Sequence, residues 1–345
     1  MILLYILFVL LGLFGISYKK EGFYDDNMGR SQCDAIKGLC IILVFIRHIF
    51  QYIDDSGYDY SLWGDHYASI LDGMTRQLLV AFFLFSSGFG IMESIRDKGK
   101  SYIRSIPKRR ILTTLLNYEV AVCAFILLDI IIDTQLSFRQ IALTFVCWES
   151  IGNSNWYIFA ILACYIIVYL VFDLSEGIIE TKRVLLPLFF SFLFYLLLIS
   201  SLKSSCWYDT IFCYPAGMLF SIYKNRIKPF LQQYYIIALL LPLVILALLY
   251  YTPDYKGIIH NIYSISLCLF IIILTMKVRI GNKALYWLGA NLFPLYIYQR
   301  LPMLAIYSYD NGSFVRNHII LYILICSVVI TIITYLYKYW QIKLK

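Results

Sequence analysis

A basic residue and a histidine lie eleven positions apart between Arg30 and His48. In an α-helix, eleven residues turn about 20° past three full turns and rise about 16 Å, so Lys37 and His48 share one face. That rise is roughly half of a ~30 Å hydrocarbon core. An imidazole at mid-depth can act as a general base or carry an acyl group, and the cation can hold an anionic donor at the mouth of the groove. The spacing therefore indicates acyl-transfer chemistry at His48.

Further ionisable residues fall inside apolar stretches, where an ionisable group costs at least ~2.5 kcal/mol and usually faces a cavity or a partner. Glu119 is expected at the depth of His48, and Arg47 and Arg300 at a similar level. The sequence predicts a shared polar cavity, with His48 and Glu119 as catalytic candidates and Arg47, Arg300 and Asp34 around them. The alternative is that Glu119 only neutralises one of the arginines, because buried charges need partners.

The composition requires these residues to be held by membrane helices. Hydrophobic residues make up 61% of the chain and charged residues 14%, and the mean hydropathy is +0.74, which excludes a soluble domain of 345 residues. The net charge of +8 does not indicate nucleic acid here, because the positions of the basic residues matter more than their sum. Nine cysteines without paired spacing are interpreted as buried thiols, with no disulfide and no metal site.

The hydropathy pattern predicts an all-α polytopic membrane protein of about eleven transmembrane helices. After a first apolar run over residues 1–17, the expected spans are 38–54, 74–94, 111–132, 156–174, 184–202, 211–223, 234–251, 262–277, 286–307 and 319–340. The first run lacks a basic n-region and a small-residue cleavage pattern, so an uncleaved helix is preferred over a signal peptide.

The connections between these spans alternate in charge. Every second connection, together with the C-terminal tail, carries most of the basic residues, 22 of 29 in all. Because basic loops stay in the cytoplasm, we expect the N-terminus outside and the C-terminus in the cytoplasm, in a bacterial inner membrane.

Five stretches in order resemble the membrane-bound acyltransferase family 3. The run Cys33–Leu39 followed by His48 resembles its opening signature, in which a basic residue precedes a histidine by ten intervening positions. The other four are residues 80–89, ending in Ser-Gly-Phe, and 152–157, 214–218 and 288–298. The chain departs from the family at Gln299, where a histidine often stands. The remaining histidines, His66, His260 and His318, are expected on outer loops.

The resemblance implies a ten-helix membrane domain over residues 30–340. The expected helix over residues 1–17 departs from the family pattern, and the soluble domain that some relatives carry is not expected here. The resemblance also implies an acyl-CoA donor, in the first place acetyl-CoA, with Lys37, Lys108, Arg109 and Arg110 as candidates to bind its phosphates. Guanidinium groups suit phosphate oxygens, although a basic loop can also serve membrane topology alone.

The resulting hypothesis is transfer of an O-acetyl or other acyl group from cytoplasmic acyl-CoA to a hydroxyl of a cell-surface or lipid-linked glycan. The outer loop 55–73 is acidic and aromatic and could contact a sugar, although aromatic residues also anchor helices at membrane interfaces. Ser87 is assigned to helix packing rather than nucleophilic catalysis, because no base accompanies it. The alternative is a transporter or flippase of lipid-linked sugars, against which stands the lack of an internal repeat or of paired broken helices.

Overall fold

The computed structural model describes residues 2–60, 63–75, 77–174, 181–250 and 256–344. In this part of the chain nearly all regular structure is helical, and two short strands form one antiparallel pair. The elements of the N-terminal half are α1 (Ile2–Leu13), β1 (Ser17–Tyr18), α2 (Arg30–Asp55), α3 (Trp63–Thr75), α4 (Leu78–Lys98), α5 (Lys100–Ile106), the π-helix η1 (Pro107–Leu112), α6 (Thr113–Ile131), α7 (Phe138–Phe145) and α8 (Asn155–Leu174).

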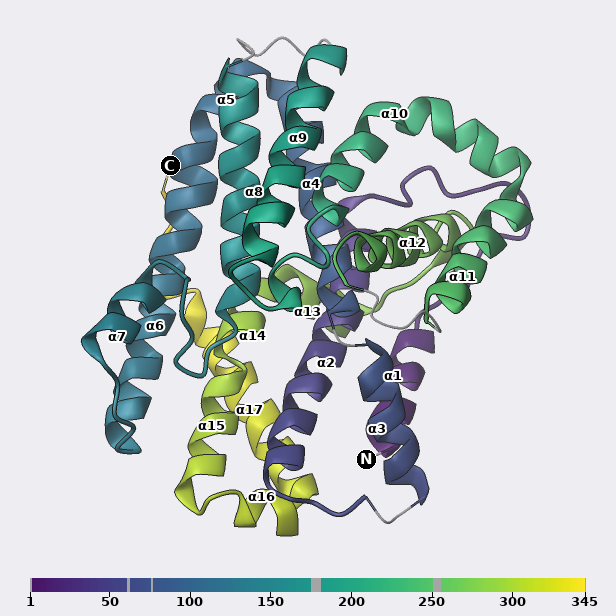
Figure 1. Cartoon of the computed structure of the whole chain (residues 1–345). Coiled ribbons are helices and arrows are strands. Elements are labelled where there is room, and N and C mark those ends of the chain that lie inside the picture. The colour runs from purple at the N-terminus through teal and green to yellow at the C-terminus, as the bar shows by residue number, and fades with distance from the viewer. Residues whose placement is uncertain (1, 61–62, 76, 175–180, 251–255, 345) are drawn as a thin grey trace.

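The C-terminal half contains α9 (Thr181–Ser200), the 3-10 turn η2 (Ser205–Trp207), α10 (Cys213–Gln233), α11 (Tyr235–Tyr250), α12 (Ile258–Leu274), β2 (Val278–Arg279), α13 (Lys283–Ala290), α14 (Leu292–Tyr298), α15 (Arg300–Tyr309), α16 (Ser313–Asn317) and α17 (Ile319–Tyr337). Figure 1 shows α5, α8 and α9 standing side by side at one end of the molecule, while α2, α15 and α17 run toward the other.

In the described residues, four helical stretches are long and apolar enough to cross a membrane, or five if one bent pair counts as a span. They are Gly64–Lys98, Lys100–Ile131, Asn155–Leu174 and Ile319–Tyr337, and the bent pair is α10 and α11, which meet at 101°. The chain is thus a multi-pass membrane protein, but the predicted eleven crossings are not confirmed. The expected first span is a 12-residue helix, about 18 Å long, and the expected span 286–307 is interrupted into α13, α14 and α15.

Glycines set the closest helix contacts. A side chain at Gly88 in α4 would collide with the Tyr214 carbonyl, and one at Gly217 in α10 would collide with the Phe85 carbonyl. The same reciprocal arrangement joins α2 and α13 through Gly38 and Gly289. Small residues let membrane helices approach closely enough for backbone contact. The Ser-Gly-Phe stretch of α4 accordingly packs against α10 through Gly88.

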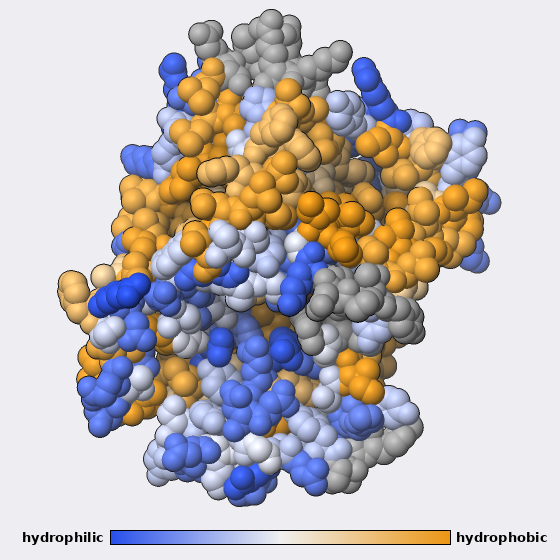
Figure 2. Space-filling view, viewed as in Figure 1, coloured by the Kyte–Doolittle hydropathy of each residue, from blue (hydrophilic) through white to orange (hydrophobic). Residues whose placement is uncertain are grey.

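The largest buried cluster gathers side chains of α4, α6, α8, α10 and α14, including the fully buried rings of Phe83, Tyr118, Tyr214 and Tyr296. Figure 2 shows hydrophobic side chains covering the upper half of the molecule, while the lower middle, where α2, α14 and α15 descend, is hydrophilic and hollowed. This cluster includes α8 and α14, two of the helices that lie next to the predicted site.

The strands join the N-terminal segment to the second half of the chain. Ser17 pairs with Arg279 and Tyr18 with Val278, and the backbone N–H of Lys19 donates to the Lys277 carbonyl at 2.9 Å. Segment 14–29 is therefore held against the connection that leads into α13. The cysteines are predominantly buried or partly buried, whereas Cys123 is exposed and departs from the prediction of buried thiols.

Candidate active site

His48 lies on the buried side of α2, with 8% of its surface exposed. Its Nε2 is 3.3 Å from the Oγ of Ser154, at the start of α8, and no hydrogen-bond partner among the described residues reaches its Nδ1. When Nε2–H donates to Ser154, Nδ1 keeps its lone pair. The imidazole is thus oriented through Nε2 by Ser154, and the Gln299 side chain is a second hydrogen-bonding neighbour of the ring.

The loop before α8 is fixed by side-chain amides, which in turn place Ser154. The Asn153 amide donates to the Tyr118 hydroxyl at 3.0 Å, and its Oδ1 accepts from the Ile151 N–H at 3.2 Å. Asn155 donates to the carbonyls of Cys147 and Glu149, both at 2.8 Å. Buried amides with these partners hold a loop rigidly. Ser154 therefore meets His48 from a backbone that is fixed on both sides.

Arg300 and Gln299 approach the imidazole from α15. Arg300 and Arg47 both act on His48 electrostatically, and the Gln299 side chain is a further neighbour. Arg300 makes no ion pair in the described part of the chain; its Nη2 lies 3.5 Å from the Tyr52 hydroxyl, and its Nε has no partner. Arg300 is only partly buried, and a cation held there without a carboxylate is available to bind an anion or to stabilise developing negative charge.

Several buried polar atoms around His48 lack protein partners among the described residues. They are the Nδ1 of His48, the Oε1 of Gln299, the Nε of Arg300 and the hydroxyl of Tyr296. Such atoms are rare in folded proteins, because each costs about 1–3 kcal/mol. Their concentration beside one imidazole makes this the candidate place for a polar substrate.

Arg47 differs from Arg300 because it forms an ion pair with Asp72 of α3. The Asp72 side chain is only 5% exposed, so the pair neutralises a buried carboxylate beside the site. The structure thus brings Arg47, His48 and Arg300 into one neighbourhood.

Glu119 and Asp34 are placed differently. Glu119 is partly exposed and has Cys147 as an electrostatic neighbour, while the adjacent Tyr118 is the residue that holds the loop beneath Ser154. Asp34 lies in the first turns of α2, fourteen residues and about 21 Å before His48. It contacts Lys37 at 3.7 Å, so the structure does not bring it to the imidazole.

The predicted phosphate ligands occupy two helix groups. Lys37 lies on α2, which packs against α13, whereas Lys108, Arg109 and Arg110 lie in η1, which packs against α5, α6 and α8. The three η1 side chains are exposed and have no carboxylate partner among the described residues. Arg110 Nε lies 3.2 Å from the hydroxyl of Tyr102. The η1 cations are therefore free to bind an anion.

A second group of basic side chains lies on α10, but unlike those of η1 these side chains are paired with carboxylates. Lys224 pairs with Glu93 at 2.5 Å and Lys228 with Asp25 at 3.2 Å, at a polar pocket of about 380 Å³ between residues 25–29 and α10. Because carboxylates already neutralise these cations, this pocket suits a phosphate group less well than η1 does.

The expected positions of two histidines are wrong. His66 lies in α3 and His260 in α12, where its Nδ1 is 3.1 Å from the Asp209 carbonyl. Only His318, between α16 and α17, lies on a connection as predicted. Within the described ranges, no group of three or more His, Cys, Asp or Glu side chains could hold a metal ion.

The sequence alone does not identify Ser154 as a partner of His48, although the polar run before α8 is visible in it. A serine at this place is ordinarily explained as a helix cap. Ser154 becomes a partner of His48 only in the folded chain, because the two residues are 106 positions apart in the sequence.

An oriented imidazole among membrane helices, beside a guanidinium that has no carboxylate partner in the described part of the chain, is an arrangement suited to group transfer. The family model described as the acyltransferase domain matches residues 30–338, so the chain belongs to acyltransferase family 3. No curated protein and no solved structure gives a significant match.

Proposed function

We propose that this membrane acyltransferase transfers an acyl group, in the first place acetyl, from acyl-CoA to a hydroxyl of a cell-surface or lipid-linked glycan. The observation that carries the proposal is the His48 imidazole, held by Ser154 at Nε2 and without a partner at Nδ1. The proposed setting is the bacterial inner membrane, with the basic connections in the cytoplasm.

In this proposal, His48 Nδ1 takes the proton of the acceptor hydroxyl as its oxygen attacks the thioester carbonyl. Arg300 stabilises the negative charge that develops on the carbonyl oxygen. The carbon–sulfur bond then breaks, the new ester leaves, and the imidazolium returns its proton to the coenzyme A thiolate. Glu119 and Arg47 remain proposed contributors through their charges near the site.

The donor's phosphates are proposed to bind to Lys108, Arg109 and Arg110, with Lys37 as a further cation. Their support is chemical: the η1 guanidinium groups are exposed and lack carboxylate partners in the described part of the chain. Coenzyme A carries phosphates that match such a cluster.

The test is acylation by purified protein in detergent, with acetyl-CoA as donor and the host's isolated envelope glycan as acceptor. His48→Ala should reduce the rate by about 10²–10⁴-fold, the range expected for losing a general base. The matched control His318→Ala changes an exposed histidine and should retain activity. A His48→Ala protein that elutes and melts like the wild type, yet acylates normally, would overturn the proposal.

A flippase of lipid-linked sugars is kept as a second candidate on one observation. The interruption of the expected span 286–307 into α13, α14 and α15 produces broken helices of the kind that line transport sites. Reconstituted vesicles separate the two functions: movement of a fluorescent lipid-linked sugar without any acylation would favour transport.

A further inference from the structure

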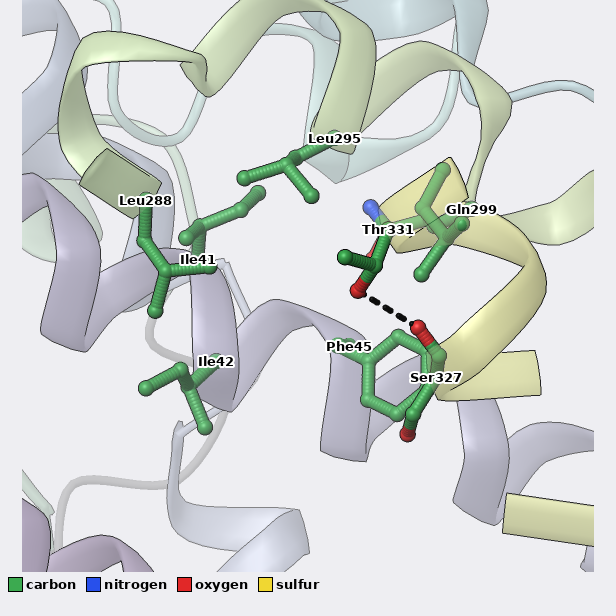
Figure 3. A pocket seen from close by; sticks show the side chains of 9 residues that line it. Ile41, Ile42, Phe45, Leu288, Leu295, Gln299, Ser327 and Thr331 are labelled. Carbon is green, nitrogen blue, oxygen red and sulfur yellow. Dashed lines mark hydrogen bonds between the residues drawn. The ribbon is translucent and has the colours of Figure 1, made fainter. Parts of the chain in front are cut away.

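An apolar pocket of about 190 Å³ lies next to the His48 site. Figure 3 shows its lining, contributed by α2, α13, α14 and α17 together with Gln299. The lining residues are Ile41, Ile42, Phe45, Leu288, Leu295, Gln299, Ser327, Ile330 and Thr331.

The pocket presents almost no polar atoms to an occupant. The hydroxyl of Ser327 donates to the Ile323 carbonyl and that of Thr331 to the Ser327 carbonyl, both at 2.7 Å, so both donors are used within α17. The remaining polar side chain is Gln299, which is 1% exposed and whose Oε1 has no partner. No lining residue is ionisable. An occupant must therefore be aliphatic and uncharged, with at most one polar group at the Gln299 end.

The pocket and the imidazole lie along the same face of α2 and have Gln299 as a common neighbour. Ile41, Phe45 and His48 are four and three residues apart on α2, so all three side chains lie on one face of the helix. Gln299 is both a lining residue and a neighbour of the imidazole. Gln299 therefore joins the two, and an acyl chain whose carbonyl carbon is at His48 would enter the pocket at its Gln299 end.

We propose that this pocket binds the aliphatic chain of the transferred acyl group, so that the enzyme accepts uncharged acyl chains longer than acetyl. The inference rests on the proposed function and specifies its donor class. An apolar cavity of about 150 Å³ holds benzene, so this pocket takes a chain of roughly six to eight carbons. The single methyl group of an acetyl donor fills little of it.

Because no charged side chain lines the pocket, it should also distinguish uncharged from charged acyl groups. A succinyl group has the same number of carbons as a butyryl group but ends in a carboxylate. Burying that carboxylate without a cation or hydrogen-bond donor is strongly unfavourable. The pocket therefore selects butyryl over succinyl donors.

The experiment measures dissociation constants of acetyl-, butyryl-, hexanoyl- and succinyl-CoA for the purified full-length protein by calorimetry, without an acceptor. Burial of one methylene corresponds to up to about fourfold in affinity, so hexanoyl-CoA should bind at least about tenfold more tightly than acetyl-CoA. Succinyl-CoA should bind more weakly than butyryl-CoA.

Two matched variants of α17 locate the effect. Thr331→Phe fills the pocket and should reduce the preference for hexanoyl over acetyl by about tenfold or more. Val328→Phe introduces the same ring on the same helix at a residue that is 57% exposed and outside the pocket, and should leave the preference unchanged.

The outcomes are distinct. Equal affinity for acetyl- and hexanoyl-CoA, or a preference that Thr331→Phe leaves intact, would overturn the inference and assign the pocket to a bilayer lipid tail. In either case acetyl-CoA binding would leave the proposed function standing. No binding of any acyl-CoA by the folded protein would instead count against the proposed function itself.

Discussion

The Oγ of Ser154 lies 3.3 Å from the Nε2 of His48, which joins α8 to α2 across 106 residues of sequence. Both side chains are buried, at 3% and 8% exposure. A histidine held at one nitrogen presents the other in a defined direction, so the position of Ser154 sets the geometry of the proposed base.

Replacing Ser154 by alanine should slow acyl transfer by about threefold to tenfold, because a neutral hydrogen bond contributes about 0.5–1.5 kcal/mol. Steady-state rates with acetyl-CoA measure this effect. Ser201→Ala removes an exposed hydroxyl that donates only to Leu198 and serves as the control. An unchanged rate in Ser154→Ala would mean that the imidazole does not need this partner.

Replacing Arg110 by glutamine should raise the KM for acetyl-CoA by about tenfold to a hundredfold, with a smaller effect on kcat. A charged hydrogen bond to a phosphate contributes about 1.5–3 kcal/mol, and binding that is equal in the ground and transition states appears in KM. Lys100→Gln removes another exposed cation of the same basic connection. Equal KM values for the two variants would argue that η1 serves topology alone.

Replacing Gly88 by alanine should destabilise the protein by about 1–3 kcal/mol, because the added methyl group collides with the Tyr214 carbonyl. Gly90, two residues along the same helix, has nothing within 4 Å of an added Cβ. Gly90→Ala should therefore be neutral or slightly stabilising. Melting temperatures of the two variants in detergent compare them directly, and identical values would mean that α4 and α10 can separate freely.

Asp209 should make stability depend on pH. This residue, in the connection before α10, is 1% exposed, and burial raises the pKa of its carboxyl. Because the folded state then holds the proton more tightly than the unfolded state, the stabilising contribution is present at acidic pH and is lost as pH rises through the folded pKa. Asp209→Asn retains the Oδ1 that accepts from the Gly257 N–H at 2.6 Å.

The Asp209→Asn protein should therefore melt higher than the wild type at neutral pH, and the difference should shrink toward pH 4. Melting curves across this range provide the measurement. If the difference in melting temperature instead grew on acidification, the pKa of Asp209 would be lowered by folding and not raised.

The parts of the site that depend on one helix could be predicted from the sequence. Lys37 and His48 do lie on the single helix α2, because helical periodicity is a local property. The contact between His48 and Ser154 depends on how α8 packs, and no local pattern encodes it.

On α6, two adjacent residues face different surroundings. Tyr118 reaches the loop that holds Ser154, whereas Glu119 is rotated by about 100° around the helix. Since α6 is apolar on most sides, its sequence does not reveal which face turns inward. The interruption between α13 and α14 is similarly hard to predict, because Asn291 is a single polar residue within an otherwise apolar stretch.

The pairing of β1 with β2 has a consequence for the order of assembly. Translation proceeds at about 5–20 residues per second, so the strand at Ser17 is made roughly 13–50 s before its partner at Arg279. Helix α13 contacts the backbone of α2 at Gly289, and it is synthesised directly after β2. The helix that carries His48 is thus among the first inserted and among the last to gain all of its packing partners, so a nascent chain stalled before residue 280 would hold every earlier helix and still lack part of the candidate site.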